Sequence, residues 1–480
     1  LRTLSVVYDV CKQIGIDSSE IDPHDPSIYA ALASLRSPQG LFQIEAETNF
    51  KVCQLIAPRN LEQLSAVVAI ARPGALEFKD NYRDYVRSGE FQSVHEFFDD
   101  ILSYTGGIPL YQEQLMKMAV KVGFSLDESE QLRRIVGKKK VDQMPAWKAK
   151  IEEKVKENNL DTAVADVLWK VAEDSANYSF NKSHSISYAY LAAVTVYLKF
   201  NYPQQFFLSL LKYAKFEPNS HEEIARISQE LSHFDIKLLP PDLNKSDIDF
   251  KIEGKDIRYG LNSIKGVSDK VLEALLEFRE DSFDNKYEVF LSAKQAGLNI
   301  GTLSALIQAG LLDSFVSSNR CRLVLEAQTF NILTDREKRN FVELGEKYSY
   351  DILVAVHDCF KNEAVGDDNR KLFTDKRFST FKKKYDPYKN IYEMNRTHIK
   401  YANWFFEEKL LGYSYSYNVR QVFNHEEDFH SSEVIKDAEN RSNVKFVGSL
   451  IDIMRRTSRN NNKYARMQLQ DECGVVNGLF

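Results

Sequence analysis

The chain has 480 residues, of which 43% are hydrophobic and 28% charged, and its formal net charge at pH 7 is −6. A chain of this length exceeds one ordinary hydrophobic core, so we expect roughly two to four domains. Five scattered cysteines without a Cys-x-x-Cys pair and nine histidines without a cluster argue against a disulfide framework and a structural zinc site. The longest apolar run, 186–198, is too short to span a bilayer and we find no secretory signal, so we expect a soluble cytoplasmic protein with no membrane partner.

Positive charge is concentrated in three stretches of this mildly acidic chain. Residues 133–140 hold five Lys or Arg, residues 370–389 hold eight against two Asp, and residues 452–470 hold five against one Asp. Such stretches indicate patches that neutralise phosphate, while the acidic remainder discourages indiscriminate binding. The alternative is that each stretch is a solvated face of a helix or strand.

The first of these stretches ends a predicted helix over 125–137. Ser125 and Glu128 form a capping box at its start, and Gly137 is the expected stop. The apolar face consists of residues three and four apart, namely Leu132, Ile135 and Val136.

The cations of this stretch must therefore lie off the apolar face and converge beyond the helix end. They are Arg133, Arg134, Lys138, Lys139 and Lys140. One or two cations would complement the helix dipole, worth about 0.3–1 kcal/mol, but five repel one another. A phosphate-rich ligand would offset that repulsion through charge-assisted contacts.

Five phrases in a fixed order give this stretch its context. They are GLFQIEAE (40–47), AIARPGAL (69–76), TGGIPLYQEQLMKMA (105–119), QLRRIVGKKK (131–140) and FNKSHSISYAYLAAVTVYLKFNYPQQF (180–206). This order resembles the bacterial C-family replicative DNA polymerases, the DNA polymerase III alpha subunits. The same order continues in LLPPDLNKSDIDF, IRYGLNSIKGVSDKVL, LSALIQAGLLDSF and VKFVGSLIDIMRRTSRNNNKYARMQLQD.

The resemblance implies a mainly α protein with α+β parts. Its expected parts are the end of a palm (1–39), all-α fingers (40–214), a tail with a helix-hairpin-helix (215–320), a clamp-binding or linker region (321–442) and the start of an OB-type β-barrel (443–480).

The fingers of this family bind the incoming deoxynucleoside triphosphate. The resemblance implies a pocket lined by Arg72, Gln112, Gln114, Arg133, Arg134, Lys138, Asn181, Lys182, Ser183 and His184. The cations at the helix end would grip the triphosphate, and Lys139 and Lys140 would contact nearby DNA phosphates. His184 would contact the sugar edge; alternatively it caps a helix or packs in the core.

Tyrosines recur through the same segment, at Tyr188, Tyr190, Tyr197 and Tyr202. We expect them to pack in the core rather than against a base, because residues 186–200 are apolar almost all round.

Polymerisation of this kind uses two metal ions held by carboxylates. The resemblance places these palm aspartates upstream of Leu1, so we expect Mg²⁺ to be bound outside this chain and the fragment alone to be inactive. Asp247 and Asp249 in SDIDF look like a two-metal motif on one face of a predicted strand. They follow the fingers, however, where the family has no catalytic residues, so we reject them.

Two further segments are expected to contact DNA. IKGVSDKVLEALLEF reads as a helix-hairpin-helix turn in which Lys265 and the backbone of Gly266 approach duplex phosphates. Ser268 replaces the usual second glycine, and a hairpin that only packs is the alternative. Two strands, VKFVGSLIDIM and YARMQLQD, are joined by a turn and would present Arg455, Arg456, Arg459 and Lys463 to a single-stranded template.

A sliding-clamp peptide is also expected from the resemblance. The best match is NRKLF (369–373), with Leu372 and Phe373 as the docking residues, although it lacks the usual Gln. The basic stretch around it carries Phe378, Phe381 and Tyr385, which either track DNA or pack on the protein.

The function implied is DNA-templated DNA synthesis, with primer-template DNA, deoxynucleoside triphosphates and a sliding clamp as partners. The rival hypothesis is a non-catalytic module that binds DNA and docks on a clamp.

Overall fold

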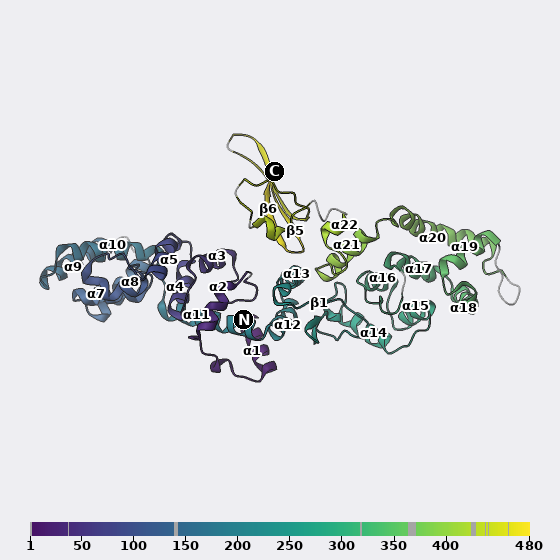
Figure 1. Cartoon of the computed structure of the whole chain (residues 1–480), viewed down its shortest axis with the longest axis horizontal. Helices are drawn as coiled ribbons and strands as arrows, with labels where there is room; N and C mark the ends of the chain where they lie inside the picture. Colours follow the sequence, from purple (N-terminus) through teal and green to yellow (C-terminus); the bar gives the residue numbers. More distant parts are fainter. Residues whose placement is uncertain are drawn as a thin grey trace. The chain divides into compact units, whose positions relative to one another are not determined.

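The computed structural model describes residues 2–36, 38–138, 143–316, 319–362, 371–423, 429–436, 438–439, 441–458 and 460–480. The chain divides into two compact units, Leu1–Phe206 and Phe207–Phe480, with the division inside helix α12 (Pro203–Ala214). The fold is mainly helical with small sheets, as predicted (Figure 1). None of the described helices is long and apolar enough to cross a membrane.

The first unit is built from helices alone in its described part. These are α1 (Arg2–Ile14), α2 (Pro26–Ser34), α3 (Glu47–Ile56), α4 (Leu61–Ile70), α5 (Lys79–Ser88), α6 (Asp99–Leu102), α7 (Gln112–Val122), α8 (Leu126–Gly137), α9 (Met144–Glu157), α10 (Thr162–Tyr178) and α11 (Lys182–Asn201).

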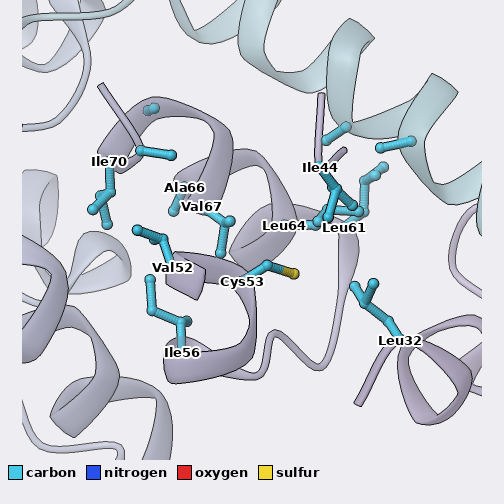
Figure 2. Packing of buried hydrophobic residues seen from close by; sticks show 14 of the residues in the cluster. Leu32, Ile44, Val52, Cys53, Ile56, Leu61, Leu64, Ala66, Val67 and Ile70 are labelled. Carbon is cyan, nitrogen blue, oxygen red and sulfur yellow. The ribbon is translucent and has the colours of Figure 1, made fainter. Parts of the chain in front are cut away.

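Helix α4 is the centre of one core in this unit. Its sequence, LEQLSAVVAI, has apolar or small residues on every side after the first turn, so the helix is buried all round. It packs against α3 and α11. Figure 2 shows Leu64 and Val67 of α4 among Val52 and Cys53 of α3. The long helix α11 is therefore fixed along most of its middle, where Ala192 to Val196 are buried.

A second core lies between α7, α8, α9 and α10. Its largest members are Trp147 and Trp169, and the ring of Trp147 lies 5.8 Å from that of Phe124, between α7 and α8. Leu132 and Val136 of α8 are buried here and Ile135 is partly buried, which confirms the predicted apolar face. This packing determines which way the cations of α8 point.

The second unit mixes helices with two small sheets. Its elements are α13 (Ser220–Leu231), β1 (Leu238–Leu239), β2 (Lys251–Glu253), β3 (Asp256–Arg258), α14 (Asp269–Arg279), α15 (Lys286–Gln295), α16 (Ile300–Gln308), α17 (Arg320–Ile332), α18 (Asp335–Glu343), α19 (Ile352–Asn362), α20 (Asp375–Asn395), α21 (Ile399–Leu411), α22 (Val419–Val422), α23 (Ser432–Lys436), β4 (Ser449–Thr457), β5 (Lys463–Asp471) and β6 (Gly474–Leu479).

Helix α17 is the hub of this unit, since it packs against α15, α16, α19, α20 and α21 (Figure 1). Arg320 at its start is buried and forms ion pairs with Asp313 and with Glu407 of α21. The buried Glu407 carboxylate also accepts hydrogen bonds from the backbone N–H groups of Tyr415 and Ser416. This network joins the segments 313–320 and 407–416, which are far apart in the sequence.

The last sheet is antiparallel with strand order β4-β5-β6, which is consistent with the start of an OB-type barrel. The predicted hairpin is confirmed, although β4 begins at Ser449 rather than near Val444. The first sheet has the order β1-β3-β2, and the turn between β2 and β3 passes through Gly254 at φ +65°.

Candidate nucleic-acid interface

Helix α8 begins as the sequence predicts and ends differently. The hydroxyl of Ser125 accepts from the backbone N–H of Glu128, whose carboxylate accepts from the N–H of Ser125. Gly137 is the last helical residue rather than the stop, and Lys138 is the C-cap with φ −92°. The glycine is thus not used for a left-handed turn, since neither it nor Lys138, the last described residue at this end, adopts a positive φ.

The arginines of α8 are held by an acid that the sequence analysis missed. Glu130 accepts two hydrogen bonds of 2.7 Å from Arg133 and one of 2.7 Å from Arg134. Hydrogen bonds from Arg133 and then Arg134 lower the pKa of Glu130 to about 2. The predicted repulsion between neighbouring cations is therefore partly cancelled within the helix. The spacing i−3 and i−4 from the arginines was the signal that pointed to Glu130.

The side chains of the two arginines differ in their exposure and in their hydrogen bonds. Arg133 is 27% exposed, and its Nη1 also donates to Oε1 of Gln112 at 3.0 Å. Arg134 is 66% exposed and, among the described residues, hydrogen-bonds through its side chain to Glu130 alone. Lys138 is exposed. Arg134 and Lys138 are thus the cations of α8 most exposed to a ligand, and Arg133 is less exposed.

Gln112 links the arginines to the start of α11. Its backbone N–H donates to the carbonyl of Phe180 at 2.8 Å, and the N–H of Phe180 donates to the carbonyl of Leu110 at 3.0 Å. This short parallel pairing brings the segments 110–112 and 180–184 side by side. Two of the phrases recognised in the sequence therefore meet in space.

The N-terminus of α11 is capped twice. Oδ1 of Asn181 accepts from the N–H of His184 at 2.8 Å, and the carboxylate of Glu113 accepts from Nδ2 of Asn181 and from the N–H of Lys182. The hydroxyl of Ser183 donates to Asn181 at 2.7 Å. Asn181, the N-cap, is therefore a positioning residue, and Glu113 is a second one that the sequence analysis did not single out.

A row of aromatic rings runs along the exposed side of α11. The guanidinium of Arg72 lies 4.8 Å from the ring centroid of Phe180. The ring of His184 lies 5.8 Å from that of Phe180 and 4.1 Å from that of Tyr188. Tyr188 in turn stacks on Phe42 at 5.0 Å. We call Arg72, Phe180, His184, Tyr188 and Phe42 the ring row.

The ring row bears on two expectations. His184 is exposed and neither caps α11 nor sits in a core, which excludes the alternative role. Tyr188, Tyr190, Tyr197 and Tyr202 are half-buried rather than buried; Tyr197 packs against the first core as expected, whereas Tyr188 belongs to the ring row. The reason is that α11 is buried on the side of Ala189 and Ala193, which leaves the tyrosines at its margins.

The surroundings of Gln114 do not match its predicted place in the nucleotide pocket. Its side chain is fully buried, accepts from the N–H of Tyr111 at 2.9 Å and donates to the carbonyl of Ile101 and to the hydroxyl of Thr105. A buried amide with all these partners satisfied is structural. Lys182 is also engaged, since its ammonium lies 3.3 Å from Glu62 and over the ring of Tyr104.

The helix-hairpin-helix turn lies in the second unit. Gly266 adopts φ +91°, is exposed and has no atom within 4 Å of where a side chain would project. Ser268, in place of the second glycine, is the N-cap of α14 and accepts from the N–H of Val271. The N–H of Lys265 donates to the carbonyl of Leu410 in α21 at 2.9 Å, while its side chain is exposed. The backbone of the turn is thus fixed to α21, while Gly266 and the side chain of Lys265 are exposed to solvent.

The basic hairpin of the last sheet is exposed. Arg455 pairs with Ala465, Arg456 with Tyr464, and Thr457 with Lys463 across β4 and β5. These residues and Phe480 line a shallow pocket of about 420 Å³. Arg459, Lys139 and Lys140 lie outside the described residues.

The predicted clamp-docking residues are not available for docking. Leu372 and Phe373 are 4% and 6% exposed, and the ring of Phe373 lies 4.8 Å from Phe381 and 6.5 Å from Phe378. Phe373 precedes the N-cap Thr374 of α20 and Phe378 is at the fourth helical position, so the pair forms a hydrophobic staple. The Leu-Phe pattern is explained by this staple, and Asn369 and Arg370 lie outside the described residues.

Burial of the aromatic residues distinguishes the two roles expected for the basic stretch 370–389, namely tracking DNA and packing on the protein. Phe381 and Tyr385 are buried and pack on the protein, whereas Lys382, Lys383 and Lys384 are exposed.

The carboxylates of SDIDF do not form a metal site. Asp247 and Asp249 lie in a loop before β2 rather than on a strand, so they do not share one face. Asp247 pairs with Lys251, and Asp249 accepts from Asn262 and Lys215. Burial raises the pKa of Asp249, but these hydrogen bonds outweigh it and lower the pKa overall. Both carboxylates are therefore already neutralised.

Within the described ranges, one other group has the ligand types of a metal site, namely Asp471, Glu472 and Cys473. The Asp471 carboxylate accepts hydrogen bonds from the N–H groups of Ser432, Cys473 and Gly474, and Glu472 pairs with Arg420. This group closes the turn between β5 and β6 and joins it to α23. The carboxylates described here do not fit a two-metal polymerase site.

Comparisons with known proteins agree with this layout. Residues 2–159 match the bacterial DNA polymerase III alpha subunit finger domain, and residues 235–323 match a helix-hairpin-helix motif. The chain is 34% identical to DNA polymerase III subunit alpha of Thermus aquaticus over 339 residues, which is 68% of this chain and 27% of that protein. It is 32% identical to the Aquifex aeolicus protein over 336 residues, covering 68% and 28%, and 35% identical to the Campylobacter jejuni protein over 332 residues, covering 66% and 27%. The chain thus spans about a quarter of the length of these relatives. Residues 2–159 thus correspond to the finger domain of bacterial DNA polymerase III alpha subunits, and the chain as a whole is similar to a fragment of these proteins.

Proposed function

We propose that this chain supplies the nucleotide-binding and DNA-binding part of a DNA-directed DNA polymerase that copies a DNA template in the cytoplasm. The observation that carries the proposal is the meeting of four separate sequence segments in the first unit. Arg72, Gln112, Arg133 and the start of α11 are connected by contacts of Phe180 and Gln112.

The charges of this site suit a triphosphate. Arg134 and Lys138 are exposed, and Arg133 is fixed by Glu130 and Gln112 so that its position changes little when a ligand binds. Guanidinium groups bind phosphate oxygens in pairs, which gives both affinity and orientation. An incoming triphosphate would compete with Glu130 for the two arginines.

The ring row suits the remainder of a nucleotide. His184 and Tyr188 present half-exposed rings one helical turn apart on α11, and stacking of a base on such rings contributes about 1–3 kcal/mol. Ser183 and Asn181 offer polar groups at the same helix start. We assign the sugar edge to His184 and the base to Tyr188.

The second unit would hold the DNA. Gly266 is exposed in a left-handed turn, so a duplex phosphate can approach its backbone without a side chain in the way. Arg455, Arg456 and Lys463 offer separate positive charges for a single-stranded template. A sliding clamp remains a proposed partner, but we assign it no docking peptide because Leu372 and Phe373 are buried.

The reaction that we propose uses Mg²⁺ to stabilise charge at the transferred phosphate. The described carboxylates do not fit a two-metal site, so we assign none of them to the binding of this ion. What the residues of this chain do is bind the triphosphate, orient the base and hold the DNA.

Nucleotide binding is tested by titrating dATP into the purified chain by calorimetry. We expect binding to weaken in an Arg133→Ala, Arg134→Ala double variant and to be unchanged in Lys170→Ala, an exposed lysine on α10. If dATP binds the double variant as tightly as the wild type, the triphosphate assignment is wrong.

DNA binding is tested with a primed duplex. We expect affinity to fall steeply with salt, with a log-log slope near −0.9 for each neutralised phosphate. We expect no primer extension with Mg²⁺ and deoxynucleotides. Extension that Asp249→Asn abolishes would refute our rejection of that aspartate, and salt-independent binding would refute the phosphate contacts.

The dATP titration also separates the rival hypothesis. A module that only binds DNA would bind the primed duplex with the same salt dependence but would show no response of dATP binding to the arginine variants.

A further inference from the structure

A pocket between α15, α16, α17 and α18 contains two lysines. Its volume is about 360 Å³, and Lys294 of α15 and Lys338 of α18 lie in its wall. The rest of the wall is largely apolar, with Phe290, Leu298 and Phe330 as its main members. Lys338 lies beyond residue 323, where the matched helix-hairpin-helix motif ends.

Lys338 is an unusual lysine. It is only 5% exposed, and its ammonium lies 5.6 Å from the ring centroid of Phe330. In the described part of the chain this ammonium has no hydrogen-bond acceptor and no ion-pair partner, and it is not fully enclosed, so it is open to the pocket that Lys338 lines. An anionic ligand in the pocket would stabilise this mostly buried charge.

The surroundings of Lys338 are positive. Lys294 lies beside it, and burial together with the charge of Lys294 lowers the pKa of Lys338. Asp335 is the nearby carboxylate, and it pairs at 3.3 Å with Lys294 rather than with Lys338. Two ammonium groups therefore face one exposed carboxylate, which leaves an excess positive charge at the pocket.

The start of α16 adds to this charge. The helix has nine residues, and Oδ1 of its N-cap Asn299 accepts from the N–H of Thr302 at 2.9 Å. The N–H groups of Ile300 and Gly301 precede that bond and have no acceptor within the helix. Asn299 and Ile300 both line the pocket, so the positive end of the helix dipole faces the same space as the lysines.

We propose that this pocket binds a phosphate group, held by the ammonium groups of Lys338 and Lys294 and by the first N–H groups of α16. Apolar walls from Phe290 and Leu298 lower the local dielectric and strengthen each of these contacts. The phosphate can come from the DNA backbone or from free phosphate in solution. This inference uses residues of the second unit only and does not depend on the nucleotide site of the first.

Inorganic phosphate is the first probe. Unfolding of the second unit is followed through Trp404, its single tryptophan, in a chain carrying Trp147→Phe and Trp169→Phe. We expect phosphate to raise the unfolding temperature in a saturable way that sodium chloride at equal ionic strength does not reproduce. The same shift is expected in Lys361→Met, which removes an exposed lysine from α19.

Two variants test the lysines of the pocket. Lys338→Met keeps an unbranched side chain one atom shorter than lysine, without the charge, and should lose the phosphate-induced shift. It should fold at least as stably as the wild type without phosphate, because it removes an unpaired charge from an apolar site. Lys294→Met changes an exposed residue and should weaken the shift. If both variants respond to phosphate as the wild type does, the proposal is wrong whatever their affinity for DNA.

Duplex DNA distinguishes the two sources of phosphate. If the backbone is the source, Lys338→Met should weaken duplex binding and reduce the magnitude of the salt slope by about 0.9, which corresponds to one phosphate contact. If free phosphate is the source, Lys338→Met should lose the phosphate-induced shift while duplex binding and its salt slope stay unchanged.

Discussion

Arg134→Ala is the sharpest test of the nucleotide site, because Arg134 contributes little to the fold. Its side chain is 66% exposed, and it forms an ion pair with Glu130, four residues earlier on α8. Exposed pairs of this spacing contribute about 0.3–0.5 kcal/mol to stability. The variant should therefore fold normally, and Glu130 should keep both of its hydrogen bonds to Arg133.

The loss should appear in the use of nucleotide. A hydrogen bond to a charged group contributes about 1.5–3 kcal/mol. In the polymerase of which we propose this chain to be part, Arg134→Ala should therefore lower kcat/KM for deoxynucleotide by roughly ten- to a hundredfold. The KM should rise, and the affinity for primed DNA should change little.

Steady-state primer extension at varied deoxynucleotide concentration measures this effect. Lys170→Ala on α10 removes an exposed cation of the same unit and is the matched control. An unchanged kcat/KM in Arg134→Ala, or an equal loss in Lys170→Ala, would refute the assignment of the α8 cations to the triphosphate.

Three further predictions concern residues whose roles the structure defines. The pKa of Glu130 is lowered to about 2 from an ordinary value of 4.5, so the stabilising effect of the ionised Glu130 is present above pH 4.5 and is lost as the pH falls toward 2. The difference in unfolding free energy between the wild type and Glu130→Gln should therefore shrink over that range. A difference that stays constant would contradict the ion pairs. Phe373→Ala should destabilise the second unit by about 3–5 kcal/mol in urea unfolding followed through Trp404, as expected for a buried aromatic; a change below about 1 kcal/mol would instead fit an exposed peptide. Gln114→Leu should destabilise the first unit by about 1–3 kcal/mol for each partner left without a hydrogen bond, measured by fluorescence of Trp147 and Trp169; a variant with wild-type stability but impaired nucleotide binding would restore Gln114 to the pocket.

Local patterns in the sequence determined the helical elements of the site. The capping box at Ser125 and the apolar spacing of Leu132 and Val136 give α8 and its buried face, because both depend on residues within one or two turns. The glycine turn at Gly266 was also predictable, since a positive φ strongly favours glycine. The same is true of the β4–β5 hairpin around its polar turn.

Polar partners were decided by the tertiary structure. Gln114 and Gln112 stand two residues apart and look equivalent in the sequence, yet one is enclosed by Ile101 and Thr105 and the other reaches Arg133. A helix places residues two apart on different faces, and which face is covered depends on helices that arrive from elsewhere in the chain. Glu113 shows the same dependence, because its partners Asn181 and Lys182 are 68 and 69 residues away.

The tertiary structure also decided which aromatic residues are buried. Leu372 and Phe373 form a pattern that suits a docking peptide or a hydrophobic staple equally well, and contact with Phe381 and Phe341 selects the staple. The sequence by itself determined the order of the family segments, the start of α8 and the cations at its end. Only the tertiary structure decided which of those polar groups remain open to a ligand, because hydrogen-bond satisfaction and burial depend on neighbours that are distant along the chain.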